Sequence, residues 1–164
     1  MSNAIKHNHP TTLTKILGIY HIQYRHITTG ENFKRYILVL ENLLNNRNLH
    51  FNSTIPSIIY DLKGSLRNRC ATIDEGQTNA VLLDENFYLQ TQEDPFYLRL
   101  HTKWTLMKAL YADTQFLAKH DIVDYSLLVA SYDDERQPIV YVGIIDYIRK
   151  YSSHLIHLNS IFFF

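Results

Sequence analysis

Several residue types are scarce in this sequence, and each scarcity excludes a class of protein. With one cysteine, Cys70, no internal disulfide can form, so a disulfide-stabilised scaffold is excluded and a reducing compartment is favoured. Five glycines and four prolines are too few for a collagen-like or linker composition. Sixteen Lys and Arg residues balance sixteen Asp and Glu residues, and the formal net charge of +0 argues against a strongly basic nucleic-acid-binding module and against an acidic tail.

Long apolar runs are also missing. The longest, residues 139–145, is far shorter than the roughly 20 residues of a membrane-spanning helix. The first residues, Met1 to His7, lack the apolar core of a signal peptide. Hydrophobic residues still make up 46% of the 164 residues, which excludes a wholly disordered chain. The sequence therefore predicts one soluble intracellular domain, or part of a larger one.

Residue patterns in the first part of the chain predict strands. Residues 1–12 are polar and are expected to be disordered. β-Branched and aromatic residues over 19–24 predict a strand, the cluster 28–32 predicts a turn, and the apolar end of 33–40 predicts a second strand that is buried on both faces. These two strands are expected to pair as a hairpin. A third short strand is predicted over residues 58–62.

The second part of the chain predicts a long helix and another hairpin. Asp94 as N-cap and Pro95 as first helical residue indicate where the helix begins, and Lys119-His120 suits its C-terminus. An apolar stripe with mostly three-to-four spacing predicts its buried face: Leu100, Trp104, Met107, Tyr111 and Phe116. Strands over 127–130 and 139–145, joined by a turn, form the second predicted hairpin. Antiparallel hairpins with one long helix make the fold class α+β.

Two aspartates lie at the ends of this second hairpin. Asp124 precedes its first strand and Asp146 follows its second, so pairing of the strands brings both carboxylates to the same end. Phosphoryl transfer needs such a pair, because one carboxylate orients or deprotonates the attacking hydroxyl and the other holds Mg²⁺ on nucleotide phosphates. From spacing alone, a turn residue or a cap is the more common explanation of each aspartate.

Residues 63–77 combine turn formers with alternating charges and predict a functional loop. Within it three cations, Lys63, Arg67 and Arg69, surround Gly64. Glycine permits close backbone approach, and Lys and Arg are the usual partners of phosphate. A solvated basic turn explains the same residues equally well.

Five short strings carry a family resemblance. They are Leu17-Gly18-Ile19-Tyr20, Val39-Leu40-Glu41-Asn42-Leu43, Tyr60-Asp61-Leu62-Lys63-Gly64-Ser65, Asp124-Tyr125-Ser126-Leu127-Leu128-Val129 and Gly143-Ile144-Ile145-Asp146. Together and in this order they resemble the signature set of the phosphatidylinositol phosphate kinases. Three more strings are similar to the FYVE-finger class of 5-kinases that acts on phosphatidylinositol 3-phosphate. They are Ser65–Arg69, Leu82–Asn86 and Asp146–Arg149.

The resemblance implies roles for single residues. Asp124 matches the family's catalytic aspartate, and Asp146 matches its Mg²⁺-binding aspartate. Lys63 and Arg69 match the Lys and Arg of the loop that faces the lipid phosphate and the transferring phosphoryl group. Lys63 is therefore implied in both catalysis and substrate binding.

The resemblance also implies ATP binding and a departure from the family pattern. Glu41, Asn42 and Leu43 lie in a segment similar to the interlobe strand that meets the adenine of ATP. Only Gly18 and Gly30 precede position 64, so the family's glycine-rich phosphate loop is absent from these residues.

The implied organisation has three parts. They are a disordered segment over 1–12, a partial lipid kinase catalytic domain over 13–149 and a tail over 150–164 that matches no part of the family. The tail ends in three phenylalanines, which favours a truncated reading frame over a docking tail. A chain of this kind is expected to be inactive by itself.

The implied reaction is ATP-dependent phosphorylation of phosphatidylinositol 3-phosphate at the 5-position of the inositol ring, with ATP and Mg²⁺ as cofactors. The implied setting is cytoplasmic, on the surface of an endosomal or vacuolar membrane. Implied partners are the phosphoinositide lipid, that membrane, and scaffold or regulatory subunits of a longer protein, but no nucleic acid. Two alternatives stay open: a pseudokinase-like module that binds phosphoinositide or a partner without turnover, and a phosphatidylinositol 4-phosphate 5-kinase.

Overall fold

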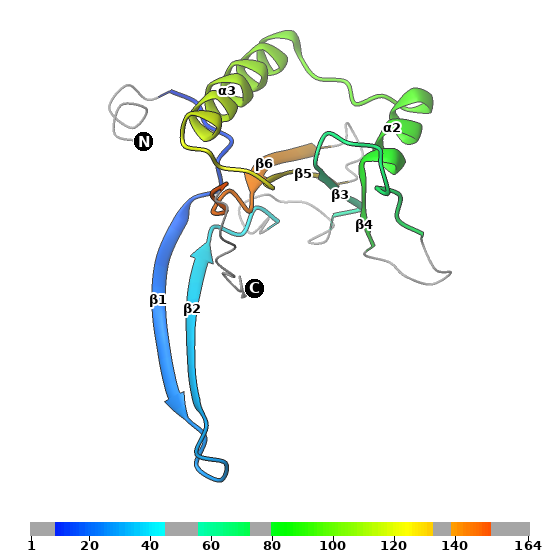
Figure 1. The fold of residues 1–164 in the computed structure, drawn as a ribbon. Coiled ribbons are helices and arrows are strands. Elements are labelled where there is room, and N and C mark those ends of the chain that lie inside the picture. Colours follow the sequence, from blue (N-terminus) through cyan, green and yellow to red (C-terminus); the bar gives the residue numbers. More distant parts are fainter. Residues whose placement is uncertain (1–8, 45–55, 73–79, 133–138, 152–164) are drawn as a thin grey trace. The chain divides into compact units, whose positions relative to one another are not determined.

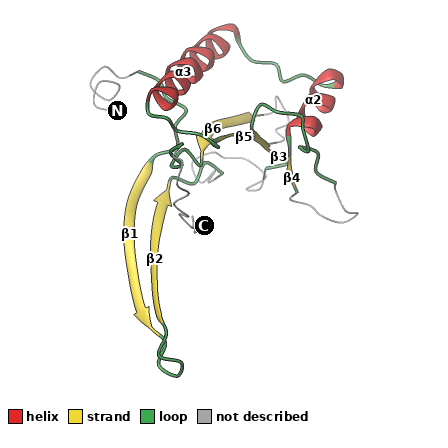
Figure 2. Ribbon diagram, viewed as in Figure 1, coloured by secondary structure: helices red, strands yellow, loops and turns green. Residues whose placement is uncertain are grey.

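The computed structural model describes residues 9–44, 56–72, 80–132 and 139–151, and contacts divide the chain into two compact units. We call residues 14–42 the hairpin unit, and the other described residues the sheet unit. Figure 1 labels their elements in chain order. The described part of the first unit contains strands only, and the second combines strands with helices (Figure 2).

The hairpin unit consists of β1 (Ile16–Arg25) and β2 (Asn32–Leu40), which pair antiparallel. Arg25 lies opposite Asn32 at the closed end of the ladder. The connection contains Gly30 at a φ of 73°, a left-handed conformation that glycine adopts without steric cost. The predicted N-terminal hairpin is confirmed, and β1 begins three residues earlier than the pattern predicts.

Much apolar surface of the hairpin unit is exposed, including Ile19 and Tyr20. The expected burial of β2 on both faces is only partly met, because residues 37–40 are half-buried whereas residues 34–36 are exposed. Tyr24 and Phe33 stack across the strands with ring centroids 5.2 Å apart. Two strands have too little surface of their own to bury both faces of a ribbon.

A four-stranded sheet in the order β4-β3-β5-β6 lies at the centre of the sheet unit. Strand β3 (Ile58–Leu62) pairs in parallel with β4 (Val81–Leu82) and antiparallel with β5 (Ser126–Tyr132), which in turn pairs antiparallel with β6 (Ile139–Ile145). The predicted third strand and second hairpin are confirmed. Strand β4 is too short to be predicted from residue periodicity. The predicted turn between β5 and β6 lies outside the described residues.

Two helices belong to the sheet unit, α2 (Asp84–Glu93) and α3 (Leu100–Lys119). Residue patterns do not predict α2, and the predicted start of the long helix at Asp94 is wrong. Asp94 is instead the C-cap of α2, and its N–H donates to the carbonyl of Gln90 at 2.8 Å. Pro95 has no N–H to continue a helix, and proline is common just after a helix end, so it follows α2 instead of opening α3.

The face that α3 buries also differs from the prediction. Four of the five predicted residues are exposed: Leu100, Trp104, Met107 and Tyr111. Leu117 instead packs in the core against Ile144 and Tyr147, with Phe116 partly buried beside it. Spacing identifies an apolar stripe on a helix, but it cannot tell which stripe the rest of the fold covers.

The first described residues are joined to α3. Of residues 1–12, for which disorder is expected, residues 1–8 lie outside the described residues. The hydroxyls of Thr11 and Thr12 donate to the carboxylate of Asp113 at 2.9 and 2.7 Å, and the N–H of Thr12 donates to it at 2.6 Å. The carbonyl of Thr12 accepts from the N–H of Ile144 at 2.6 Å. These bonds tie the segment to both α3 and β6.

The combination of antiparallel hairpins and two helices confirms the α+β fold class. The four-stranded sheet contains one parallel pair, β3 with β4. Its other two pairs, β3 with β5 and β5 with β6, are antiparallel. In the part of the chain that the structure describes, neither helix is long and apolar enough to cross a membrane.

Candidate active site

The pairing of β5 with β6 places Asp124 and Asp146 at one end of their hairpin. Ser126 lies opposite Ile145, so Asp124 comes just before the first strand and Asp146 directly after the second. Both aspartates have left-handed backbones, with φ values of 64° and 60°. Aspartate adopts this conformation more readily than most residues, and residues held in it are concentrated at functional sites. The fold thus presents two aspartates in constrained orientations, side by side.

Two cations hold the carboxylate of Asp124. Lys63 Nζ donates to its Oδ1 and to its backbone carbonyl, at 2.8 Å in each case. Arg149 Nη1 donates to its Oδ2 at 2.5 Å. These hydrogen bonds, first from Lys63 and then from Arg149, lower the pKa of Asp124 below its ordinary value. The carboxylate is therefore ionised at neutral pH.

Asp146 has the opposite electrostatic character. Burial raises the pKa of its carboxyl, and the negative charges of Asp61 and Asp124 raise it further, whereas the Lys63 ammonium acts in the other direction. Among the described residues, its carboxylate accepts no hydrogen bond and forms no ion pair. Paired carboxylates whose pKa values are displaced in opposite directions can take different chemical roles.

The loop after β3 folds around Asp84, the first residue of α2. The N–H groups of Lys63, Gly64 and Ser65 donate to its carboxylate, with shortest distances of 3.0, 2.7 and 3.2 Å. Gly64 has a φ of 73°, which favours glycine at this turn. Burial acts to raise the pKa of Asp84, but the hydrogen bonds from Arg69 and from the three N–H groups together bring it below its ordinary value.

Arg69, which the resemblance places against the lipid phosphate, points into the same cluster. Its Nε donates to Asp84 at 2.8 Å, and its Nη2 donates to the backbone carbonyl and the carboxylate of Asp61 at 2.5 and 3.2 Å. The side chain is 19% exposed. The hydrogen bond to Asp84 raises the pKa of Arg69 above its ordinary value. In this structure the guanidinium links the end of β3 to the start of α2 through hydrogen bonds to Asp61 and Asp84.

The segment implied in adenine binding spans both units. Glu41 closes the hairpin unit, where its carboxylate pairs with Lys15 Nζ at 2.9 Å and its N–H donates to the Lys15 carbonyl at 2.9 Å. Asn42 is exposed, and Leu43 belongs to the sheet unit. The part that these residues play in nucleotide binding stays a prediction.

Two residues of this site received no role from the sequence. Asp84 organises the loop after β3, and Arg149 holds the second oxygen of Asp124. Both lie inside strings that carry the family resemblance, Leu82–Asn86 and Asp146–Arg149. An acidic pair at positions 84 and 85 is a usual sign of a helix start. That sign could have predicted α2, although not the burial of Asp84.

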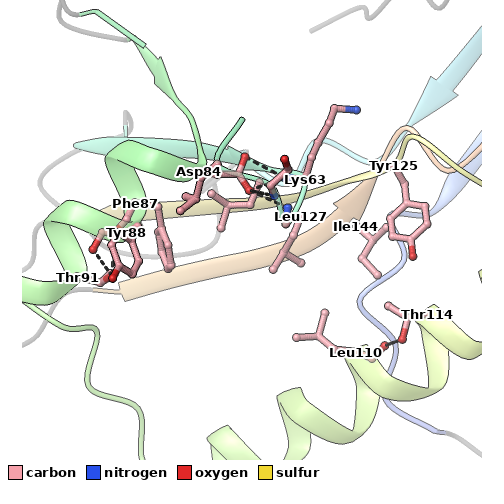
Figure 3. A pocket seen from close by; sticks show the side chains of 14 residues that line it. Lys63, Asp84, Phe87, Tyr88, Thr91, Leu110, Thr114, Tyr125, Leu127 and Ile144 are labelled. Carbon is pink, nitrogen blue, oxygen red and sulfur yellow. Dashed lines mark hydrogen bonds between the residues drawn. The ribbon is translucent and has the colours of Figure 1, made fainter. Parts of the chain in front are cut away.

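A cavity of about 620 Å³ borders the same loop (Figure 3). Its walls come from residues 62–66, from both helices and from β5 and β6, and they include Phe87, Leu110 and Ile144. The hydroxyl of Thr114 in this wall donates to the carbonyl of Leu110 at 2.8 Å. The Lys63 side chain points away from these apolar residues in Figure 3. The cavity therefore suits an apolar group better than a charged one.

The donors of the site suit a hard divalent cation that brings most of its own ligands. Carboxylate oxygens are the ligands Mg²⁺ prefers, and it usually binds one or two carboxylates together with water and substrate phosphates. Both oxygens of Asp124 are already paired, so Asp146 is the carboxylate of this pair that could hold such a cation. Within the described ranges, no group of three or more His, Cys, Asp and Glu residues could hold a metal ion.

Comparison with known proteins relates the chain to one family. The model described as "Phosphatidylinositol-4-phosphate 5-Kinase" matches residues 2–138. The 1-phosphatidylinositol 3-phosphate 5-kinase of Homo sapiens is 40% identical over 154 residues, which are 93% of this chain and 7% of that protein. Similar relatives from Arabidopsis thaliana and Saccharomyces cerevisiae are 41% and 39% identical over 93% of this chain, and it spans 8% and 6% of them.

Proposed function

The chain belongs to the phosphatidylinositol phosphate kinase family, and from that premise we propose that it forms part of a lipid kinase catalytic domain. The proposed reaction transfers the γ-phosphate of ATP to the 5-hydroxyl of the inositol ring of phosphatidylinositol 3-phosphate. One observation carries the proposal: Lys63 holds Asp124 ionised at the same hairpin end as Asp146, whose pKa is raised. Residues 13–149 would form this part of the domain, with 150–164 outside it.

The choice of lipid depends on the relatives. The human, Arabidopsis and yeast proteins are all named 5-kinases of the 3-phosphate lipid, and the chain is 39% to 41% identical to them. The family description instead names the 4-phosphate lipid. A phosphatidylinositol 4-phosphate 5-kinase is therefore the alternative with the same chemistry.

Asp124 would orient the attacking hydroxyl. Because its pKa is below the ordinary value, it is a weak base at neutral pH and accepts a hydrogen bond from the hydroxyl without removing the proton at the outset. The hydroxyl becomes more acidic as its oxygen forms the bond to phosphorus, and the proton can then pass to the Asp124 carboxylate. The contacts with Lys63 and Arg149 keep the carboxylate in place for this step.

Lys63, and Asp146 through a bound Mg²⁺, would counter the negative charge of the phosphates. The Lys63 ammonium, which lies 2.8 Å from Asp124, places positive charge beside the acceptor hydroxyl. Asp146 would hold Mg²⁺, which when bound neutralises charge on the nucleotide phosphates. A cation there would also relieve the repulsion that Asp61 and Asp124 exert on Asp146.

The remaining parts of the proposal concern the setting. Glu41, Asn42 and Leu43 are the proposed adenine-facing segment. The protein would act as a peripheral enzyme on the cytoplasmic face of an endosomal or vacuolar membrane, where its lipid substrate lies. Scaffold and regulatory subunits are proposed partners.

A phosphate-transfer assay tests the proposal on the longest natural protein that contains these residues. Vesicles carry one monophosphorylated phosphatidylinositol at a time, and chromatography identifies the labelled lipid formed from ATP and Mg²⁺. Product from the 3-phosphate lipid that disappears in Asp124→Asn and Asp146→Asn supports the proposal. Asp121→Asn is the matched control, since Asp121 is exposed and has a similar φ of 56°. Product from the 4-phosphate lipid alone favours the alternative, and product from no lipid contradicts both.

A module that binds phosphoinositide without turnover is the second candidate. It is favoured by the glycine content, because only Gly18 and Gly30 precede residue 64 and these residues hold no glycine-rich phosphate loop. Flotation with vesicles separates the two. Binding to inositide-containing vesicles without any transfer from ATP would favour the binding module.

A further inference from the structure

Three consecutive backbone N–H groups after β3 converge on one carboxylate. Those of Lys63, Gly64 and Ser65 donate to Asp84, and Arg69 Nε supplies a further charged donor at 2.8 Å. The Asp84 side chain is 8% exposed. A buried carboxylate is costly unless donors surround it, so the loop conformation and the charge of Asp84 stabilise each other.

A glycine-containing loop with flanking cations reads in sequence as a cradle for phosphate. In this structure the cradle already contains an anion, because the Asp84 carboxylate accepts the backbone N–H groups that a phosphate would need. The Lys63 side chain extends away from Asp84 (Figure 3) and ends 2.8 Å from Asp124. The N–H groups of Lys63, Gly64 and Ser65 are therefore not available to a phosphate.

We propose that Asp84 and Arg69 are positioning residues, which together hold the backbone of residues 63–65 so that the Lys63 ammonium stays on Asp124. The inference rests on the proposed function, in which Lys63 and Asp124 belong to the reacting centre. It adds two residues that touch neither the substrate nor the reacting atoms.

Arg69 also connects the loop to the end of β3. Its Nη2 donates to the carbonyl and carboxylate of Asp61, while its Nε donates to Asp84 at the start of α2. A planar guanidinium reaches both partners at once, which a lysine ammonium on a flexible stem does not. Arg69 therefore contacts Asp61 and Asp84 and acts through the loop that carries Lys63, instead of contacting the lipid phosphate.

Trypsin provides the first test, on the purified 164-residue chain, because it cleaves after Lys63, Arg67 and Arg69 within the loop. Asp84→Asn replaces the carboxylate with an amide. The amide keeps one acceptor oxygen and has a donor in place of the other. The initial cleavage rate at these bonds, measured by mass spectrometry, should rise about tenfold or more. Asp113→Asn is the matched control, since Asp113 is equally buried and accepts three hydrogen bonds outside the loop.

A second variant guards against loss of folding. Arg69→Lys keeps the charge and the trypsin site but loses the fork that bridges Asp61 and Asp84. If circular dichroism shows Asp84→Asn to be unfolded, Arg69→Lys decides the test. Loop cleavage in the folded variant that is no faster than in Asp113→Asn overturns the proposal.

A double-mutant cycle provides the second test, in the longest natural protein that contains the chain. Asp84→Asn should lower kcat by about ten- to a hundredfold, because a small misplacement of Lys63 is costly. Combined with Lys63→Met, it should cost no more than Lys63→Met alone, since Asp84 acts through Lys63. Losses that multiply would mean an independent role and would overturn the proposal. Asp113→Asn should lower Tm without lowering kcat.

The two tests separate this inference from the proposed function. If the unaltered protein phosphorylates no inositide, the proposed function fails, and loop cleavage alone decides whether Asp84 and Arg69 hold the loop. If the unaltered protein is active and Asp84→Asn leaves kcat unchanged, the inference alone fails.

Discussion

The ammonium of Lys63 donates to both the carboxylate and the backbone carbonyl of Asp124, at 2.8 Å in each case. The two residues are 61 positions apart in the sequence. Because Leu62 at the end of β3 lies opposite Leu127 near the start of β5, the register of the sheet brings them together. One cation thereby restrains the side chain and the main chain of a residue that also has a left-handed backbone.

Replacing Lys63 should separate activity from stability. Lys63→Ala should lower turnover of the longest natural protein by about a hundredfold or more, because it removes charge beside the acceptor hydroxyl. Stability should change by no more than about 1 kcal/mol, since partly exposed ion pairs contribute little. Kinetic assays and thermal unfolding measure the two effects. Lys103→Ala, at an exposed site on α3, is the control. A large loss of Tm in Lys63→Ala with a proportional loss of activity would indicate that Lys63 has a structural role.

Asp146→Asn should stabilise the chain, and in the longest natural protein it should abolish transfer. Because the fold raises the pKa of Asp146, it disfavours the charged form, and that cost is present at pH values above the raised pKa. Removing the charge should therefore raise Tm at neutral pH, as measured by calorimetry. Asp121→Asn should leave Tm nearly unchanged. A lower Tm for Asp146→Asn would show that a contact to its carboxylate outweighs the repulsion.

Acid should destabilise the chain through Asp84. Its folded pKa lies below the ordinary value of 3.8, so its contribution is complete above that value and is lost as pH falls through the folded pKa. Urea unfolding across this window should show a shallower loss in Asp84→Asn than in the unaltered chain. Asp124 has a pKa shift in the same direction, so part of the slope should remain. Identical acid dependence of the two chains would rule out the contribution of Asp84.

Two leucines of α3 test which face of the helix is buried. Leu117 is 1% exposed and Leu100 is 71% exposed. Leu117→Ala should lower the free energy of unfolding by about 2–5 kcal/mol, because it leaves a cavity in the core. Leu100→Ala should change it by about 0.5 kcal/mol or less. Denaturant titration checks both, and a larger effect at Leu100 would restore the face predicted from spacing.

The 164-residue chain should not catalyse transfer by itself. It spans 7% of its human relative, and only Gly18 and Gly30 precede residue 64. Positioning of the reactants accounts for about 7–11 kcal/mol of barrier lowering, so a chain without a glycine-rich phosphate loop should have almost no activity. With ATP, Mg²⁺ and phosphatidylinositol 3-phosphate, the chain should form no more product than its Asp146→Asn variant. Product that depends on Asp146 would contradict this expectation.

Local residue patterns were sufficient for most strands. Local residue types predicted β1, β2, β3, β5 and β6, because strand pairing through a short turn depends on neighbouring residues. The same reasoning placed Asp124 and Asp146 at one hairpin end, since antiparallel pairing of adjacent strands leaves no other arrangement. The family resemblance came from short strings, which a sequence carries without any knowledge of contacts.

Only the tertiary structure decided which helix face is buried and what holds the loop after β3. Periodicity cannot distinguish Leu117 from Leu100, because both lie on apolar stripes of α3 and only packing against β6 separates them. Asp84 lies 21 residues beyond Lys63, and nothing near either position reveals that one carboxylate accepts the loop's N–H groups. The sequence by itself thus determined the strands and the paired aspartates, whereas burial and long-range hydrogen bonds, which depend on residues far apart in the chain, required the assembled fold.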